Sequence, residues 1–450
     1  MALKALDIYK ILPKKNCKEC GDPTCLTFAM KLAAGKGDIT LCPHLDEQAR
    51  NLLGASTRPP IRLVRIGVGE RALAVGEETV LYRHDKTFYH PPGILFRIED
   101  TLPEAEIAAI VRRVRTDRVT RVGMDLAVNG IAVVNRSGQQ EQFARAVGIV
   151  EENADLPLVL MTADQKALSA ALVHCGTYRP LIHAATKDNF REMCAIAKQH
   201  GCPLAVVARG TDDLAALAAS CAKEGVADLV LDPSPQTLGE YIPAATAIRQ
   251  LAITRTAPDL GYPVFLDATA FSPEDAAIVL GIVKYASVIV TSPLSPASTT
   301  AALTLRQNIY TDPQKPIQMN PGIYRIGNPG KDAPVFMTVN FSLTYFTLEG
   351  YLEASRTPCF MLLVDTEGLS VLTAVASGKL NETLVRDSIK KFNLESEVSH
   401  RKLIIPGYAS PLSGRIEEVT GWKVLVGPRD AAEVGEFIEQ VWKKEQAAGP

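Results

Sequence analysis

The spacing of apolar residues from about residue 93 to residue 310 predicts a repeating strand–helix unit. Short apolar runs alternate there with helical stretches such as Thr211–Lys223 and Pro273–Lys284. Strands buried on both faces read as continuous apolar runs, so a weak two-residue alternation is expected. The eight predicted strands are Ile94–Ile98, Arg121–Val128, Pro157–Met161, Pro180–His183, Pro203–Ala208, Asp228–Leu231, Pro263–Leu266 and Ser287–Val290. Eight such repeats over roughly 215 residues predict a (β/α)8 TIM barrel.

Residues 335–450 repeat the alternation on a smaller scale and predict an open α/β sheet of Rossmann or flavodoxin type. Strands are expected at Phe336–Val339, Phe360–Val364, Lys402–Ile405 and Lys423–Val426. Helices are expected at Leu343–Glu353, Ser370–Gly378, Glu382–Phe392 and Asp430–Lys444. Residues 311–334 are rich in proline and glycine and are predicted to be a linker.

The first 92 residues do not show this strand–helix alternation. Residues 1–57 are predicted to form a small unit, with helices at Leu3–Leu12, stopped by Pro13, and around Asp46–Leu53. Residues 58–310 then hold a short linker (Arg58-Pro59-Pro60), antiparallel hairpins over 61–92 and the barrel. Gly67–Ala72 resembles a G-x-G-x-x-A dinucleotide fingerprint, but no helical pattern follows it, so we interpret it as a hairpin turn.

Composition narrows the possible functions. The chain has 450 residues, enough for about three domains. The formal net charge of −2 argues against a nucleic-acid-binding surface, which needs clustered Lys and Arg. No apolar run reaches the length of about 18 residues that a membrane helix requires, and no signal peptide is recognisable at the N-terminus. A cytoplasmic protein is therefore expected.

Four of the nine cysteines lie within the first 42 residues, spaced Cys17-x2-Cys20-x4-Cys25-x16-Cys42 and followed by Pro43. Three thiolates in one loop with a distant fourth and a proline are typical of a [4Fe–4S] cluster, whereas structural zinc usually uses two paired knuckles. The spacing favours the cluster and leaves zinc open. The other five cysteines are scattered in apolar segments, and we interpret them as buried small hydrophobes: Cys175, Cys194, Cys202, Cys221 and Cys359.

The C-terminal domain has three predicted strand–helix crossings, at 363–374, 405–414 and 426–428, and the second is full of small residues. In an open α/β sheet the ligand crevice lies outside the carboxyl ends of the strands. Small residues let the backbone approach a bulky ligand. The three crossings together predict a cofactor cleft.

With this cysteine set, a central barrel and a small C-terminal α/β domain in this order, the whole chain resembles the large (gamma) subunit of the corrinoid/iron–sulfur protein of the reductive acetyl-CoA (Wood–Ljungdahl) pathway. The resemblance implies a [4Fe–4S] cluster on Cys17, Cys20, Cys25 and Cys42. It also implies that the barrel pairs with a small (delta) subunit in a heterodimer. The C-terminal domain would bind a cobamide between the two subunits.

Many cobalamin-binding domains carry a D-x-H-x-x-G loop and a later S-x-L, and the histidine ligates cobalt from below. This chain has Asp365-x-Glu367-x-x-Ser370 and Ser410-x-Leu412, so the histidine is absent. The resemblance therefore implies a base-off corrinoid, with Ser370 and Thr373 below the cobalt. Helix capping is an alternative role for Ser370. The implied cofactor-binding residues are Asn340, Thr347, Gly368, Ser370, Val371, Leu372, Thr373, Gly407, Ala409, Ser410, Leu412 and Gly427.

The resemblance implies a methyl-group carrier without catalytic residues of its own. Co(I) would accept a methyl group from methyltetrahydrofolate, or a related pterin, through a separate methyltransferase. It would pass the methyl to the nickel site of the CO dehydrogenase/acetyl-CoA synthase. The cluster would return an electron to any cobalt that had been oxidised to Co(II). The cofactor would carry the chemistry, and the protein would set ligation and docking.

The sequence of the barrel shows few signs of a catalytic site. Its strand ends carry polar residues without a recognisable His/carboxylate pair, metal-ligand spacing or phosphate loop, so we interpret the barrel as a docking scaffold. These residues are Thr162, Asp164, Thr186, Asp188, Arg209, Asp232, Asp267 and Thr291, and His174, His183 and His200 are expected to be structural. Two alternatives remain: a pterin-binding methyltransferase barrel, and an electron-transfer protein with a cluster and no corrinoid.

Overall fold

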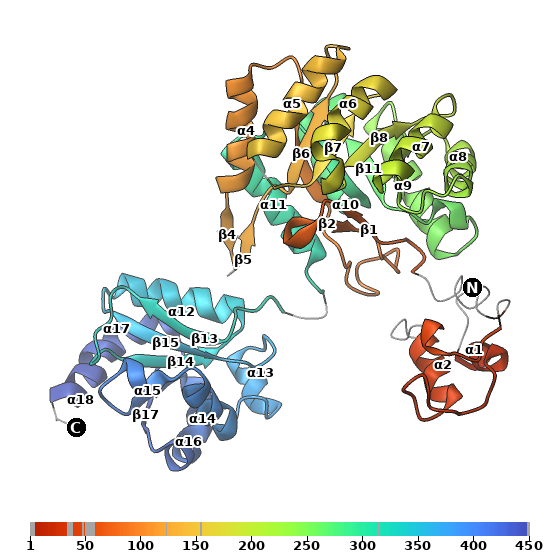
Figure 1. Cartoon of the computed structure of the whole chain (residues 1–450). Coiled ribbons are helices and arrows are strands. Elements are labelled where there is room, and N and C mark those ends of the chain that lie inside the picture. Colours follow the sequence, from red (N-terminus) through yellow and green to blue (C-terminus); the bar gives the residue numbers. More distant parts are fainter. Residues whose placement is uncertain are drawn as a thin grey trace. The chain divides into compact units, whose positions relative to one another are not determined.

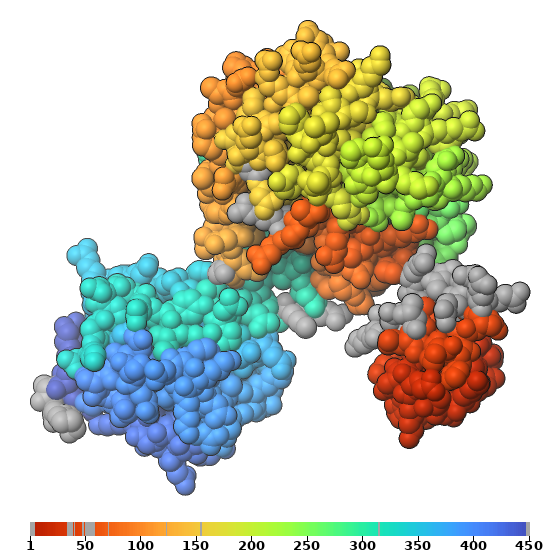
Figure 2. All heavy atoms as spheres, viewed as in Figure 1, coloured from red at the N-terminus to blue at the C-terminus, as the bar shows by residue number. Residues whose placement is uncertain are grey.

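The computed structural model describes residues 5–33, 39–46, 49, 59–122, 124–153, 155–313 and 316–447. Contacts divide the chain into two units, residues 1–119 with 126–310, and residues 120–125 with 311–450. Figures 1 and 2 show the chain coloured from red at the N-terminus to blue at the C-terminus. Among the helices of the described residues, none combines the length and the apolar character needed to cross a bilayer.

The N-terminal segment contains α1 (Ala5–Ile11), α2 (Cys25–Ala33) and a 3-10 turn, η1 (Ile39–Leu41). α1 ends two residues before Pro13, as the sequence predicts, because proline cannot continue a helix. Apolar side chains of the two helices, among them Ile8 and Phe28, share one small core. The helix predicted around Asp46–Leu53 and the start of the Arg58-Pro59-Pro60 linker lie outside the described residues, apart from Asp46 and Ala49.

A single antiparallel hairpin, β1 (Val64–Ile66) and β2 (Leu73–Val75), follows. Gly67 and Gly69 both have positive φ in the turn between them, which confirms the hairpin interpretation of the glycine motif. The predicted hairpins beyond it are wrong, because residues 76–92 contain no strand. The apolar side chains of β1 and β2 join the cluster inside the barrel, and the Gly67 N–H bonds the Arg179 carbonyl just before the strand at Leu181. The hairpin therefore closes the N-terminal end of the barrel.

Eight parallel strands close the barrel in chain order, as predicted (Figure 1). They are β3 (Gly93–Glu99), β6 (Gly130–Val134), β7 (Leu158–Met161), β8 (Leu181–Ala185), β9 (Leu204–Val207), β10 (Leu229–Asp232), β11 (Val264–Asp267) and β12 (Ala286–Thr291). The main helices are α4 (Glu104–Thr116), α5 (Gln140–Asn153), α6 (Gln165–Cys175), α7 (Phe190–His200), α8 (Thr211–Lys223), α9 (Leu238–Ile253), α10 (Glu274–Val283) and α11 (Pro296–Tyr310).

One predicted barrel strand is misplaced. The stretch predicted as Arg121–Val128 forms a two-stranded sheet of β4 (Val119–Arg121) and β5 (Met124–Leu126), and the barrel strand is β6. β4 and β5 have no buried residue, whereas four of the five residues in β6 are buried. Gly130 lies against the backbone of Pro157, where a Cβ would clash. Because a glycine interrupts an apolar run, the sequence pattern did not indicate that β6 begins at Gly130.

The C-terminal sheet has five strands in the order β13-β15-β14-β16-β17. They are β13 (Gly322–Ile326), β14 (Val335–Val339), β15 (Cys359–Val364), β16 (Lys402–Ile405) and β17 (Lys423–Val426), and only β13 is antiparallel to its neighbour. The four parallel strands therefore run in the order 2-1-3-4 of flavodoxin-like sheets, with the switch point between β14 and β16. β13 lies in the segment predicted as a linker, so that part of the prediction is wrong.

Two sets of helices cover the two faces of this sheet. Val335, Met337 and Val339 share one core with α13 (Val371–Ala376), α14 (Glu382–Lys391) and α16 (Ser413–Thr420). Phe336 faces the other way, toward α12 (Ser342–Ala354) and the C-terminal helices. Because side chains alternate along a strand, Thr338 lies on the α12 side. The last predicted helix is broken into η7 (Ala431–Glu433), α17 (Val434–Phe437), the π-helical η8 (Ile438–Trp442) and α18 (Lys443–Ala447).

Candidate cofactor sites

The four N-terminal cysteines converge, as their spacing predicts. Cys17 and Cys20 are partly exposed, whereas Cys25 and Cys42 are buried. Asn16 closes the loop, because its side-chain oxygen accepts the Cys25 N–H at 2.7 Å and its own N–H donates to the Cys25 sulfur at 3.3 Å. Asn16 therefore fixes the cysteine loop through two hydrogen bonds to Cys25, a contact that spacing alone did not reveal.

The Cys42 thiol lies within electrostatic reach of the other three N-terminal cysteines. Burial raises the pKa of this thiol, the backbone hydrogen bond of His44 lowers it, and the three neighbouring cysteines raise it further. Thiolates at the other three positions would therefore repel a Cys42 thiolate, and a bound metal would offset that repulsion.

A compact group of possible metal-ligand atoms lies at the cysteine loop. In the part of the chain that the structure describes, the one compact trio of ligand atoms within 4.8 Å is Cys17, Glu19 and His44, not three cysteines. His44 also bonds Glu19 at 3.4 Å.

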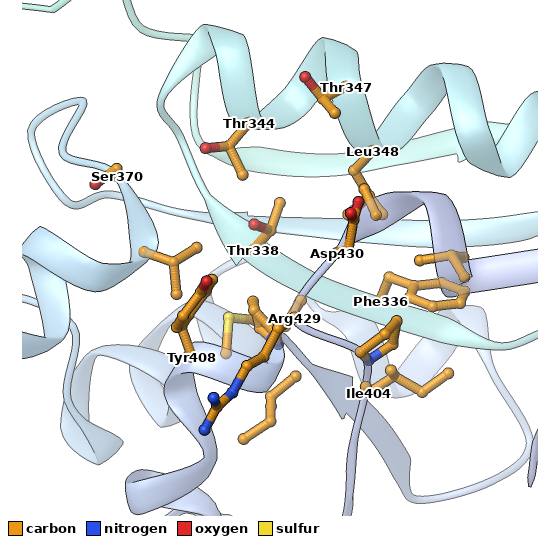
Figure 3. Close-up of a pocket in the computed structure, with 18 of the residues that line it drawn as sticks. Phe336, Thr338, Thr344, Thr347, Leu348, Ser370, Ile404, Tyr408, Arg429 and Asp430 are labelled. Carbon is orange, nitrogen blue, oxygen red and sulfur yellow. The ribbon is translucent and has the colours of Figure 1, made fainter. Parts of the chain in front are cut away.

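A pocket of about 520 Å³ opens at the carboxyl ends of β14, β16 and β17, at the switch point of the C-terminal sheet (Figure 3). Apolar side chains form much of its wall, including Phe336, Leu348 and Ile404. Polar groups join them from α12 and from the loop after β17. This volume lies within the range of about 300–1,000 Å³ that is usual for small-molecule sites.

The structure brings five of the twelve predicted corrinoid-binding residues to the pocket wall: Thr347, Ser370, Val371, Leu372 and Gly427. Leu372 is 60% exposed, so it forms an apolar rim. The remaining seven do not line the pocket: Asn340, Gly368, Thr373, Gly407, Ala409, Ser410 and Leu412. Ala409 and Leu412 are buried in the domain core, where they support the crossing after β16.

Asn340 is buried and organises the loop after β15. Its Oδ1 accepts the N–H groups of Thr366 at 3.0 Å and Gly368 at 3.1 Å. Its Nδ2 donates to Asp365 Oδ1 and to Gln318 Oε1, each at 3.1 Å. Asn340 thus positions the 365–370 loop, which it joins to the loop before β13.

Gly407 and Gly427 let two crossings approach each other. A Cβ on Gly407 would lie 2.8 Å from the backbone of Pro428 and Arg429, and the Gly407 N–H bonds the Pro428 carbonyl at 3.0 Å. Gly427 lies against the Ile405 carbonyl in the same way. Pro428 and Arg429 can therefore form this wall of the pocket only because Gly407 has no side chain.

Ser370 stands at the N-cap position of α13, but its hydroxyl makes no capping hydrogen bond. It bonds the Thr373 hydroxyl at 3.0 Å instead, so the capping alternative is wrong. Glu367, at the position of the missing histidine, pairs with Lys379. His400, the histidine of this domain, uses one ring nitrogen on the Ala333 carbonyl and the other on the Lys402 N–H. No histidine of the described C-terminal domain is thus available as a cobalt ligand.

Several pocket residues were not predicted. Thr338, Thr344, Tyr408, Arg429 and Asp430 all line the pocket, and Figure 3 shows them around its interior. The Arg429 guanidinium lies 5.7 Å from the centre of the Tyr408 ring. The crossing at 426–428 was predicted from the end of a strand. Arg429 and Asp430 follow it directly, and that position was the signal that could have identified them.

The barrel does contain a His/carboxylate pair, contrary to the sequence prediction. His183 Nε2 lies 2.8 Å from Asp232 Oδ2, although the two residues are 49 apart in sequence. The His183 ring also packs against Phe265, with centroids 4.4 Å apart. The pair forms because β8 and β10 present these two side chains toward each other near the same end of the closed barrel.

Other polar groups at this end of the barrel are paired too. Arg97 donates to Thr269 and contacts Asp267, and Asn135 donates to Thr162 at 3.0 Å. Asp164 caps α6 by accepting the Lys166 N–H. The described polar groups here satisfy one another, which is the behaviour of a structural network.

Comparison with known proteins defines the family. The family model of the CO dehydrogenase/acetyl-CoA synthase delta subunit matches residues 63–438, and a model for an Fe–S cluster matches residues 12–44. The corrinoid/iron–sulfur protein large subunit of Moorella thermoacetica is 41% identical over 439 residues, which cover 97% of this chain and 98% of that protein. The acetyl-CoA decarbonylase/synthase complex subunit gamma of Methanopyrus kandleri is 36% identical, with coverage of 97% and 98%.

The family model thus places the chain among subunits of CO dehydrogenase/acetyl-CoA synthase systems. Within that class, the chain belongs to the family of corrinoid/iron–sulfur protein large subunits and acetyl-CoA decarbonylase/synthase gamma subunits. The resemblance inferred from the cysteine spacing and the domain order is confirmed. Among solved structures, 7,8-dihydropteroate synthase from Vibrio fischeri aligns with 54% of this chain and 97% of its own, at 12% identity and a TM-score of 0.38.

Proposed function

We propose that this chain is the large subunit of a methyl-carrying corrinoid protein. Its C-terminal domain binds a base-off cobamide, and Cys17, Cys20, Cys25 and Cys42 hold a [4Fe–4S] cluster. The pocket at the switch point carries the proposal, because it combines a ligand-sized space with a loop that offers no nitrogen to a metal.

When bound, the cobalt supplies the nucleophile that takes up the methyl group, and the cluster supplies the low-potential electron that reactivates it. The chain's own residues hold and shield these groups. Asn340 fixes the 365–370 loop, and Ser370 and Thr373 place hydroxyls beside the pocket. Gly407 allows the pocket wall at residues 428 and 429 to pack closely.

We place the chain between two partner enzymes in the cytoplasm. A methyltetrahydrofolate methyltransferase is the source of the methyl group, and the nickel site of CO dehydrogenase/acetyl-CoA synthase is its destination. A small (delta) subunit completes the heterodimer and covers the open side of the corrinoid. The exposed apolar side chains at the pocket rim, Leu343, Leu372 and Tyr408, support a covering partner.

Metal analysis with an ultraviolet–visible spectrum tests the proposal on anaerobically purified protein co-expressed with the small subunit. We expect about four iron and one cobalt per heterodimer and the absorption of a base-off corrinoid. Iron without cobalt, even after cobamide is supplied, would support the electron-transfer alternative. Tight binding of methyltetrahydrofolate by the isolated chain would support the methyltransferase alternative.

A further inference from the structure

The stretch that leads into the cysteine loop is strongly basic. Residues 10–18 contain four lysines and no acidic residue, although the whole chain has a formal net charge of −2. The ion pairs of the described N-terminal segment are Lys10–Asp7, Lys31–Asp22 and His44–Glu19. Lys14, Lys15 and Lys18 are exposed and belong to none of these pairs. Within the described residues, no carboxylate therefore neutralises their three charges.

The backbone of this stretch does not explain its lysines. Lys14 and Lys18 have φ angles of 56° and 65°, in the left-handed region that glycine and asparagine adopt most easily. Asn16, between them, has a φ of 48° and fits that preference. A long charged side chain at a position that costs backbone energy points to a role for the side chain itself.

The lysines lie beside the accessible edge of the cysteine set. Of the four N-terminal cysteines, only the first two, Cys17 and Cys20, are partly exposed. Lys15 Nζ lies 3.4 Å from His44 Nδ1, and a ring nitrogen of His44 lies within 4.8 Å of the Cys17 sulfur. Lys18 follows Cys17 directly in the chain. Positive charge therefore borders the edge at which another molecule can approach the cysteines.

A redox centre at this edge needs a source of electrons. This step rests on the proposed function, in which the four cysteines hold a cluster that gives electrons to cobalt. Each electron passed on has to be replaced, and the part of the chain that the structure describes holds no other compact set of metal-ligand atoms. Because electron transfer slows steeply with distance, an outside donor has to come close to the exposed edge at Cys17 and Cys20.

We propose that Lys14, Lys15 and Lys18 form a docking surface for an acidic electron-carrier protein. The carrier loses one electron and the cluster gains it, and no bond forms or breaks. Opposite charges steer the two proteins together and raise the association rate. A small charged surface suits a carrier that has to leave again, since transient redox pairs bury little area. The net charge of −2 provides no wider basic surface for a nucleic acid.

The test follows electron transfer between the full chain and two one-electron carriers, acidic flavodoxin and basic cytochrome c. The chain is co-expressed with its small subunit and without cobamide, so that only the cluster holds the electron. One docking surface serves transfer in both directions. The cluster is therefore reduced first with titanium(III), freed of excess reductant and mixed with either oxidised carrier in an anaerobic stopped-flow instrument. We expect about 0.5 M salt to slow transfer to flavodoxin roughly tenfold, because salt screens the attraction.

Three variants isolate the charge of the docking surface. Replacing Lys14, Lys15 and Lys18 together by glutamine should slow transfer to flavodoxin roughly tenfold at low salt. Transfer to cytochrome c should be unchanged or faster, because a repulsion is removed. The corresponding triple arginine variant keeps the charge and should keep both rates. A matched control loses three exposed lysines of the barrel and should change neither rate more than about twofold: Lys166→Gln, Lys187→Gln and Lys223→Gln.

The remaining outcomes separate the docking surface from the cluster itself. An unchanged flavodoxin rate in the triple glutamine variant would overturn the docking surface and leave the lysines as a solvated face. Equal slowing with both carriers would overturn it too, since that result reports damage to the cluster rather than a lost attraction. A native protein whose iron and sulfide contents show no [4Fe–4S] cluster would overturn the proposed function, and this inference with it, before any rate is measured.

Discussion

The cysteine loop and the C-terminal pocket are both candidate cofactor sites, but they are built in opposite ways. The loop takes four donors of one kind from a short stretch of chain. The pocket takes apolar walls, hydroxyls and close backbone contacts from several strand–helix crossings. Covalent metal ligation depends on each ligand, whereas a distributed pocket loses affinity in steps. Single substitutions should therefore act all-or-none in the loop and by degrees in the pocket.

The largest effect is expected in the loop. Cys42→Ser should remove essentially all of the cluster, because three remaining thiolates do not complete its ligand set. Iron, sulfide and visible absorbance of anaerobically purified protein measure this loss. Cys202→Ser, at another buried cysteine, should retain the full iron content. Full iron in Cys42→Ser would show that Cys42 is not a ligand.

In the pocket, Gly407→Ala should act most strongly. The new Cβ would lie 2.8 Å from the backbone of residues 428 and 429, so the wall must shift at a cost of about 1–3 kcal/mol. We expect cobamide affinity to fall about tenfold or more. Gly414→Ala is the matched control, because nothing lies within 4 Å of its added Cβ. A normal affinity in Gly407→Ala would mean that this wall does not touch the ligand.

Asn340→Ala should have an intermediate effect. It leaves the buried N–H groups of Thr366 and Gly368 unpaired, and we expect a loss of about 2–3 kcal/mol in the free energy of unfolding of this domain. Both tryptophans of the chain, Trp422 and Trp442, lie in this domain, so their fluorescence follows its unfolding selectively. An unchanged denaturation midpoint would contradict the role of Asn340 as the organiser of the loop.

Ser370→Ala and Thr373→Ala should have small effects. The two hydroxyls bond each other near the domain surface, so the ligand-free protein should change by no more than about 0.5 kcal/mol. An effect on cobamide affinity of a few-fold would place the pair against the corrinoid. Unchanged affinity in both variants would remove these residues from the site.

The smallest effect on either cofactor is expected from the barrel. His183→Gln disturbs the contact with Asp232 in a network that already satisfies itself, so iron and cobalt contents should stay unchanged. The barrel itself should lose about 1–2 kcal/mol of stability, measured by circular dichroism. Binding of methyltetrahydrofolate that is present in the native chain and lost in this variant would favour the methyltransferase alternative.

Local sequence determined the parts of this protein that depend on neighbours in the chain. The spacing of the four cysteines, the end of α1 before Pro13, seven barrel strands and four strands of the C-terminal sheet could all be read from the sequence. Donor spacing and apolar runs encode these features directly. The absence of a histidine from the 365–370 loop was likewise visible in the sequence.

Tertiary structure decided the features that depend on distant residues. β6 was missed because it begins at Gly130, where the close approach of Pro157 leaves no room for a side chain. β13 was missed because it lies in a segment rich in glycine and proline and is an edge strand only through its pairing with β15. His183 and Asp232 pair only because the barrel closes. Thr338 reads as one more residue of a strand, and only packing shows that its hydroxyl is buried without a partner among the described residues. Hydrogen-bond satisfaction is a property of the folded surroundings, so no local pattern could reveal it.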